Sequence, residues 1–382
     1  MSHLTKLESA IPDRASSPFL MQGIRESKQH GLVVLSPENK RPIRRVLFVN
    51  LTGGISLWEK VKSGAVPSQH LWGCLELVRL GYEVALAEPL PNFYLYRNPF
   101  PHDLKLLKMA SSWLGPNDIV YCGHNVLYWI PFLKKLGLVR RPIVSLLYAR
   151  EPLDFSRDHA GIVALNPAAA DHARKLAPKV KVAHLGWGVD LDFFPKLSYN
   201  PQWFLSCGIT ERDHKTLCSA TAKSKAKFRL IYPGAQSISN WPSNVEVIDG
   251  GPGWNTDDKR VSFPELLYQN YDKCAASLII LKNDPVEYTA VGTTNLIEAM
   301  AMGRPVIVTK TGALPSELDI EKVGCGLFVP PEDPVALAEA VDKLAADPVR
   351  AEAMGKKGRQ LCEEHYNMDR FGNDLHTFFN SL

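Results

Sequence analysis

The sequence lacks a long apolar run, cysteine pairs of metal-binding spacing, and a large charge of one sign. No stretch reaches the ~18 apolar residues of a membrane-spanning helix, and the first residues lack the apolar segment of a signal peptide. The seven cysteines are scattered, which favours reduced thiols in a cytoplasmic protein over a disulfide framework or a zinc site. The net charge of +4 is too small to argue for a nucleic-acid partner.

The length and the alternation of elements predict two domains. A chain of 382 residues exceeds one ordinary hydrophobic core. Apolar strand-like runs alternate with amphipathic segments in both halves, which predicts an α/β protein whose parallel sheets are covered by helices. The alternation stops at 191–202, where prolines fall. We therefore place a flexible arm at 1–30, domains at 31–195 and 203–366, and a final helix at 367–382.

One stretch of the second half, residues 292–309, combines a Gly-Thr-Thr loop, a short helix, a Gly-Arg-Pro stop and an apolar strand. We expect Thr294 or Asn295 to cap the helix. The free amides and the positive end of the helix dipole point out of such a helix start. Gly292, Thr293 and Thr294 are therefore predicted to bind a phosphate.

An acid follows this loop. We expect Glu298 in the first turn of the helix, where its carboxylate would accept hydrogen bonds from the hydroxyls of a sugar. The alternative is a capping box, in which Glu298 pairs with Asn295 three residues earlier. The sugar interpretation is favoured because the preceding loop suits a phosphate.

Two places in the first half lie at the ends of predicted strands. Gly53 and Gly54 follow the strand at 46–51, and His124 follows the strand at 119–122. Ligands of doubly wound sheets bind beyond the carboxyl ends of strands. The two glycines would approach a ligand there, unless they serve only the turn. His124 is a catalytic candidate, although a lone histidine is more often structural.

Residues 126–141 place aromatic and aliphatic side chains before two pairs of cations. A helix of this composition either makes a peripheral contact with an anionic membrane, on its inner face, or packs into a domain core with its basic end solvated. The second arrangement is the more common one, and the membrane contact is kept as the alternative.

Three separated segments together resemble the retaining family 4 of glycosyltransferases. They are 186–190 with the following Phe193 or Phe194, 207–217, and 292–309. The resemblance implies the GT-B fold, in which two Rossmann-like domains face each other across a cleft and the C-terminal helix crosses back to the N-terminal domain. It also implies transfer of a hexose from a UDP or GDP sugar to a hydroxyl of a saccharide, lipid-linked or small-molecule acceptor, with retention. The donor would bind the C-terminal domain and the acceptor the N-terminal domain.

The acidic residues depart from the family pattern. The family often places two glutamates around the donor, and Glu298 matches the second, which binds the ribose hydroxyls in relatives. Ala290 stands where the first would address the donor sugar. Two alternatives stay open: a sugar-nucleotide 2-epimerase of the same fold, and a sugar-nucleotide-binding homologue without catalysis, which Ala290 suggests.

The cations depart from it as well. Relatives often have an arginine and a lysine for the diphosphate after the glycine that matches Gly208, and here Ile209 and Asp213 take those places. The leaving diphosphate gains negative charge, so catalysis needs fixed positive potential around it. Arg212 and Lys215 are the catalytic candidates, the alternative for both being a solvated loop. No aspartate or histidine cluster suits a metal, so we expect neither a metal nor a cofactor.

Overall fold

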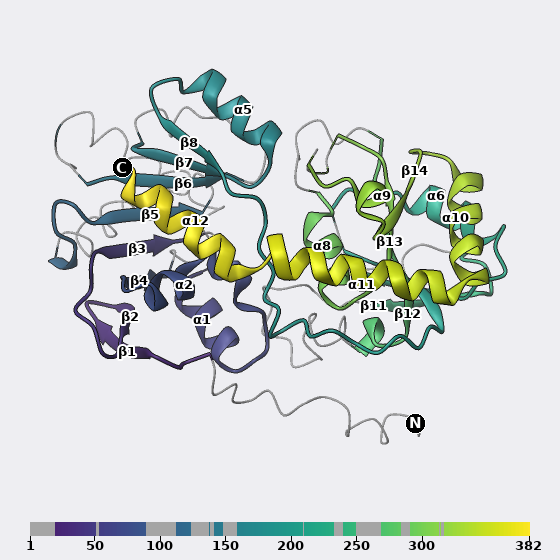
Figure 1. The fold of residues 1–382 in the computed structure, drawn as a ribbon, viewed down its shortest axis with the longest axis horizontal. Helices are drawn as coiled ribbons and strands as arrows, with labels where there is room; N and C mark the ends of the chain where they lie inside the picture. Colours follow the sequence, from purple (N-terminus) through teal and green to yellow (C-terminus); the bar gives the residue numbers. More distant parts are fainter. Residues whose placement is uncertain are drawn as a thin grey trace.

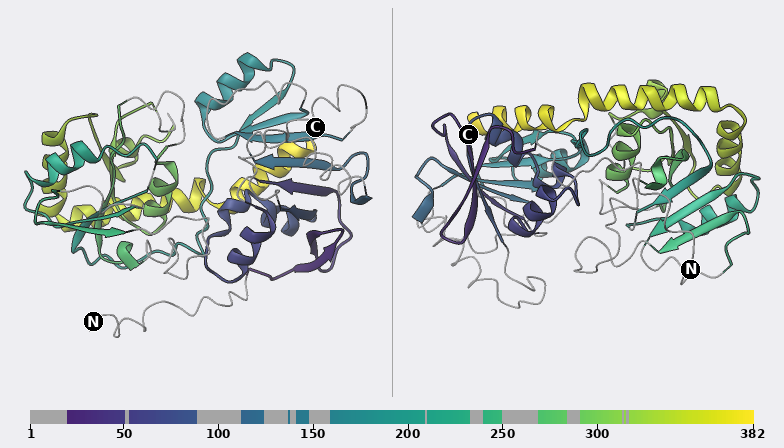
Figure 2. Two further views of the ribbon diagram at one scale, coloured as in Figure 1. Left: turned by 180° about the vertical axis from the view of Figure 1, so that it is seen from behind. Right: turned by 90° about the horizontal axis from the view of Figure 1, so that it is seen from below.

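The structure is a computed structural model that describes residues 20–50, 53–88, 112–123, 137, 141–147, 159–208, 210–232, 240–249, 269–283, 291–312, 314 and 317–382. These residues form two α/β domains that lie side by side, and the last two helices span both of them (Figure 1). The two views of Figure 2 show a separate central sheet in each domain. The predicted GT-B architecture of two sheet-centred domains is confirmed.

The N-terminal sheet has the strand order β1-β2-β4-β3-β5-β6-β7-β8. It is parallel from β4 to β8, and the change of direction in strand order falls between β3 and β5. Its strands are β1 (Ile24–Gln29), β2 (Leu32–Pro37), β3 (Arg45–Val49), β4 (Glu83–Ala87), β5 (Ile119–Gly123), β6 (Ile143–Leu147), β7 (Gly161–Ala164) and β8 (Lys181–His184).

The edge of this sheet corrects two expectations. β1 and β2 form a hairpin, and β2 also pairs antiparallel with β4, so the sheet is mixed. The expected flexible arm at 1–30 is wrong for Ile24–Gln29, which is β1, and residues 1–19 lie outside the described part of the chain. The hairpin turns at His30 and Gly31, both with positive φ (52° and 77°), as tight connections between antiparallel strands require.

The C-terminal sheet is parallel throughout, in the order β11-β10-β9-β12-β13-β14. Strand order reverses between β9 and β12, which makes the carboxyl ends of these two strands the switch point where doubly wound sheets bind ligands. Its strands are β9 (Trp203–Cys207), β10 (Phe228–Tyr232), β11 (Val245–Asp249), β12 (Cys274–Ile279), β13 (Val306–Thr309) and β14 (Gly326–Val329).

Helices cover both sheets. The amphipathic pattern at 69–80 predicts one helix, but the structure divides this segment, because Trp72 and Gly73 adopt left-handed backbone angles (φ 49° and 84°) between a 3-10 turn and an α-helix. The helices are α1 (Ile55–Lys62), η1 (Ser68–Leu71), α2 (Cys74–Arg79), α5 (Pro167–Leu176), α6 (His214–Thr221), α8 (Thr293–Ala301), α9 (Ile320–Val323), α10 (Pro334–Ala346), α11 (Pro348–His365) and α12 (Met368–Asn380).

Helix α11 runs unbroken through Gly355 and Gly358, where the sequence allowed a break. Both glycines face α8 and the turn that follows it. A Cβ on Gly355 would collide with the backbone oxygen of Gly303, and a Cβ on Gly358 would lie 3.1 Å from Met300 Cγ. The glycines therefore serve the close approach of two helices rather than an interruption.

This packing predicts different outcomes for the same substitution one turn apart. Gly355→Ala should lower the free energy of unfolding by about 2 kcal/mol, because the rigid backbone of Gly303 cannot yield and overpacking outweighs the better helix propensity of alanine. Gly358→Ala is the matched control, since the Met300 side chain can move, and it should be within about 1 kcal/mol of wild type. Urea unfolding measures both, and equal losses would contradict the packing argument.

Helix α12 crosses back to the N-terminal domain, as predicted (Figure 1). Its Phe371 ring lies 6.4 Å from Trp72, and its Phe379 ring lies 5.6 Å from Tyr121. The inter-domain linker runs beside it, where Val189 forms a bridge with Asn367. The two connections between the domains are thus side by side.

Candidate functional site

Two glycines lie at the switch point of the C-terminal sheet, one directly after a strand and one directly before a helix. Gly208 follows β9 with φ 103°, and Gly292 precedes α8 with φ 82°. Both angles lie in the left-handed region that favours glycine. A Cβ on Gly292 would lie 2.8 Å from Ile279 Cγ2, so the chain enters α8 pressed against the end of β12.

The loop after β9 is fixed to β12 by backbone hydrogen bonds. Asp213 N donates to Ile280 O at 2.9 Å, and Lys282 N donates to Glu211 O at 3.0 Å. The Asp213 carboxylate caps α6 by accepting from Thr216 N at 2.9 Å. The acid found where relatives often have a lysine is therefore a helix cap, which is a local structural role.

Arg212 lies inside the domain. Only 6% of it is exposed, so the solvated-loop interpretation is wrong for this residue. Its guanidinium donates to Cys207 O at 3.2 Å, to Thr210 O at 2.9 Å and to Asn295 Oδ1 at 2.5 Å. Burial lowers the pKa of Arg212. The side chain ties the β9 loop to the first turn of α8.

Gly208 makes room for this tie. A Cβ at Gly208 would overlap the Arg212 guanidinium and would lie 2.5 Å from Asn295 Oδ1. The structure therefore brings Gly208, Arg212 and the first turn of α8 together at the switch point, while the predicted ligand roles of Gly208, Arg212 and Gly292 stay predictions.

Among the described residues, no side chain caps the N-terminus of α8. Gly292 is the cap residue and the helix begins at Thr293, so the expected capping by Thr294 or Asn295 is wrong. Asn295 is committed to Arg212 instead. The Thr293 hydroxyl is buried and has no hydrogen-bond partner among the described residues, while Thr294 is half-buried. Free amides and an unpartnered hydroxyl at a helix start suit an anion.

Glu298 lies in the second turn of α8, since the helix begins at Thr293, and not in the first as expected. It is 2% exposed, and Oε1 accepts a hydrogen bond from Gln69 Nε2 of the N-terminal domain at 2.9 Å. The capping-box alternative is wrong, because Asn295 bonds elsewhere. Burial raises the pKa of Glu298 to about 8, against the lowering effect of the Gln69 bond.

Lys215 is exposed in the first turn of α6, where the solvated-loop interpretation fits. Its neighbour His214 was missed by the sequence analysis. The His214 ring stacks on Tyr232 with centroids 4.3 Å apart, and burial lowers its pKa. Nδ1 of His214 is buried without a partner among the described residues. A histidine at the helix start after the Gly208 loop was the available signal.

The helix start after β3 in the N-terminal domain is occupied by the protein's own carboxylate. Glu88 accepts from Ile55 N at 2.8 Å and from Ser56 N at 2.9 Å, so it occupies the N-terminus of α1. A Cβ on Gly53 would lie 2.6 Å from Glu88 Oε1, and one on Gly54 would lie 2.6 Å from Ala87 O. The glycines serve this close turn, and a ligand role for them stays a prediction.

Several predicted features lie outside the described residues. They include His124, Ala290 and the stretch 126–141 apart from Gly137 and Arg141, so the catalytic role of His124 and the membrane contact stay predictions. Among the residues that the structure covers, no three acids, histidines or cysteines gather in a way that would hold a metal ion. None of the described helices is long and apolar enough to cross a membrane.

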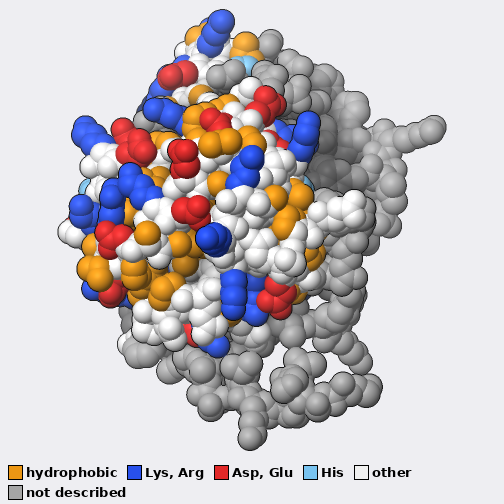
Figure 3. All heavy atoms as spheres, turned by 90° about the vertical axis from the view of Figure 1, so that its right-hand side faces the viewer, with side chains coloured by type: hydrophobic (Ala, Val, Ile, Leu, Met, Phe, Trp, Pro, Cys, Tyr) orange, Lys and Arg blue, Asp and Glu red, His pale blue; other side chains and the backbone are white. Residues whose placement is uncertain are grey.

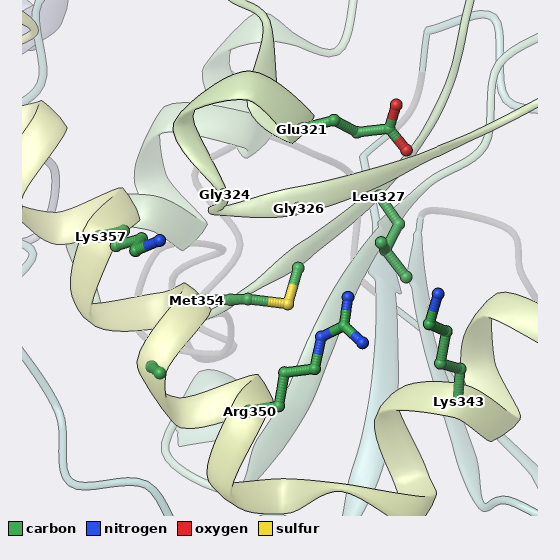
Figure 4. Close-up of a pocket in the computed structure, with 9 residues that line it drawn as sticks. Glu321, Gly324, Gly326, Leu327, Lys343, Arg350, Met354 and Lys357 are labelled. Atoms are coloured by element: carbon green, nitrogen blue, oxygen red, sulfur yellow. The ribbon is translucent and has the colours of Figure 1, made fainter.

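A hollow of about 410 Å³ lies elsewhere on the C-terminal domain, between β14 and helices α9, α10 and α11 (Figure 4). Gly324 and Gly326, at the amino end of β14, line this hollow. It therefore lies toward the amino ends of the strands, whereas the switch point lies at their carboxyl ends. Its cations Lys343, Arg350 and Lys357 are exposed. The end of this domain interleaves cations and acids (Figure 3), as a solvated surface does.

Comparison with known proteins places this site in context. Residues 275–361, which run from β12 into α11, match the family described as Glycosyl transferases group 1. A segment of 87 residues is 36% identical to alpha-maltose-1-phosphate synthase from Mycolicibacterium smegmatis. That alignment spans 22% of this chain and 22% of the relative, so it concerns less than a quarter of each protein.

Solved structures resemble the whole chain in fold. Sucrose-phosphate synthase from Thermosynechococcus elongatus has a TM-score of 0.62 at 14% identity, over 88% of this chain and 98% of its own. The Anabaena protein Alr3699/HepE, solved in complex with UDP-glucose, has a TM-score of 0.56 at 14% identity, over 89% and 100%. At these identities the likeness concerns the fold.

Proposed function

We propose that the chain is a retaining hexosyltransferase, because residues 275–361 match the Glycosyl transferases group 1 family and both domains together have the GT-B fold. The donor is a nucleotide-diphosphate hexose, and UDP-glucose is the first candidate because HepE was solved with it. The acceptor is a hydroxyl of a saccharide, lipid-linked or small molecule. The protein works in the cytoplasm, without a metal or a cofactor.

The observation that carries this proposal is the uncapped start of α8 at the switch point. Its free amides and the buried hydroxyl of Thr293 lack partners in the described part of the chain, as a site awaiting an anion would. Gly292, Thr293 and Thr294 bind the donor diphosphate, and Gly208 lets the β9 loop approach it. Glu298 accepts hydrogen bonds from the ribose hydroxyls.

The chemistry follows from where charge develops. As the bond from the anomeric carbon to the diphosphate breaks, the diphosphate gains negative charge beside the positive end of α8, which lowers the barrier. Lys215 is exposed and adds positive charge from the start of α6. Arg212 acts at the same place by holding the two loops together through Asn295. His124 addresses the acceptor hydroxyl from the N-terminal domain.

Product analysis with a panel of nucleotide sugars tests the proposal. The donor-bound protein should unfold at a higher temperature, in proportion to the logarithm of ligand concentration over affinity. With a donor and a mixture of sugar acceptors, the free nucleotide and an α-linked product should appear together. Appearance of an epimerised donor without any acceptor would instead indicate a sugar-nucleotide 2-epimerase. Binding without nucleotide release would indicate the non-catalytic homologue that Ala290 suggests.

A further inference from the structure

Gln69 joins the two domains at the donor side of the molecule. It lies in η1, is 1% exposed, and uses both ends of its side-chain amide. Nε2 donates to Glu298 Oε1 at 2.9 Å, and Oε1 accepts from Asp190 N of the inter-domain linker at 3.0 Å. One side chain therefore connects the linker to the carboxyl group that the proposed function assigns to the donor ribose.

The linker in turn fixes η1. The Asp190 carboxylate accepts from Ser68 N at 2.8 Å and from Ser68 Oγ at 2.7 Å through Oδ2, and from Phe193 N at 2.9 Å through Oδ1. The neighbouring Val189 N donates to Tyr366 O at 2.8 Å. Rotation of one domain against the other would move this linker, and the movement would carry Gln69 toward or away from Glu298.

Glu298 depends on this one contact. In the described part of the chain Gln69 is its only hydrogen-bond partner, and no cation pairs with it. The other ionisable groups near it are the thiol of Cys207 on β9 and, through Asn295, the guanidinium of Arg212. From α11, Cys362 Sγ donates to the backbone oxygen of Ile297, the residue before Glu298. In η1 the residue after Gln69 is His70, which burial keeps neutral by lowering its pKa to about 4.

We propose that Gln69 is a positioning residue for the donor, which aims the Glu298 carboxylate at the ribose only while the inter-domain linker holds Gln69 against α8. The inference rests on the proposed function, because it needs a nucleotide at Glu298. An amide that donates to a carboxylate favours its ionised form, and a ribose hydroxyl needs that form as its acceptor. Donor affinity is thereby tied to the arrangement of the two domains.

The test measures UDP affinity by titration calorimetry over about three pH units, from pH 6 to pH 9. Gln69→Met keeps the length of the side chain and removes both hydrogen-bonding ends. It should weaken UDP binding about tenfold at neutral pH. The midpoint of the rise of UDP affinity with pH should also move to higher pH, because Glu298 loses the hydrogen bond that favours its ionised form. Gln360→Ala, an exposed glutamine of α11, is the control and should bind as wild type does.

Two double variants separate positioning from a general disturbance of the fold. Gln69→Met should cost nothing further in a Glu298→Gln background, and Asp190→Asn should weaken UDP binding only where Gln69 is present. Wild-type affinity and pH dependence in Gln69→Met, or an equal loss in the Glu298→Gln background, would overturn the inference. Failure of the wild-type protein to bind UDP or any other nucleotide would overturn the proposed function itself.

Discussion

Glu298→Gln should bind UDP about 10–100-fold more weakly than wild type and should at the same time be more stable without ligand. The first effect follows because an amide cannot replace a carboxylate that accepts two ribose hydroxyls. The second follows because the wild-type carboxyl is buried with Gln69 as its only partner in the described part of the chain. Loss of affinity together with a gain in stability marks a residue that is kept for binding and not for the fold.

The stability difference should depend on pH with a defined sign. Burial raises the pKa of Glu298 from the ordinary 4.5 to about 8. Between these values the folded protein holds a proton that the unfolded chain has released, so the free energy of unfolding of the wild type falls as pH rises, by about 1.4 kcal/mol for each unit. Glu298→Gln lacks this dependence.

Thermal and urea unfolding would measure the difference in the free energy of unfolding between the two proteins at about pH 5, 7 and 9, which span the titration of this carboxyl. Calorimetry would measure UDP binding. Glu339→Gln, which changes an exposed acid on α10, is the control and should alter neither property. A Glu298→Gln protein that binds UDP as tightly as wild type would show that the ribose lies elsewhere.

Arg212→Lys should lower the free energy of unfolding by about 3 kcal/mol and slow transfer at least tenfold. The planar guanidinium reaches two carbonyl oxygens and Asn295 at once, and an ammonium group cannot satisfy all three positions. Those buried acceptors would be left unpaired, and the β9 loop would separate from the start of α8.

Urea unfolding and initial rates with saturating donor separate the two effects. Arg174→Lys is the matched control, because Arg174 is exposed on α5 and pairs with Asp171 one turn away. It should change neither stability nor rate. If Arg212→Lys slows transfer while stability stays at the wild-type level, Arg212 contacts the diphosphate directly rather than through the loops it holds.

Local patterns predicted most of the elements, because alternation and apolar runs report burial along one strand or helix. The strands predicted at 46–51 and 119–122 lie at Arg45–Val49 and Ile119–Gly123 in the structure. Where a backbone angle departs from the regular value, the pattern misled: a periodic stretch at 69–80 is divided by the left-handed residues Trp72 and Gly73. Apolar spacing carries no information about such angles.

The site was predictable in its chain segments but not in its contacts. The Gly208 loop and the start of α8 were identified because glycine and threonine before a helix indicate free backbone amides that can bind an anion. The partner of Glu298 could not be identified, since Gln69 belongs to the other domain and nothing in its neighbours indicates that role. Burial of Arg212 likewise depends on Asn295, far along the chain.

The return of α12 has a consequence for the order in which the protein is made. The aromatic side chains Trp72, Tyr82 and Tyr121 leave the ribosome before the C-terminal domain, yet the rings that pack on them, Phe371 and Phe379, are synthesised after that domain. The N-terminal domain is thus completed only after the C-terminal domain has been made, and until then its apolar face is open to chaperones and to self-association.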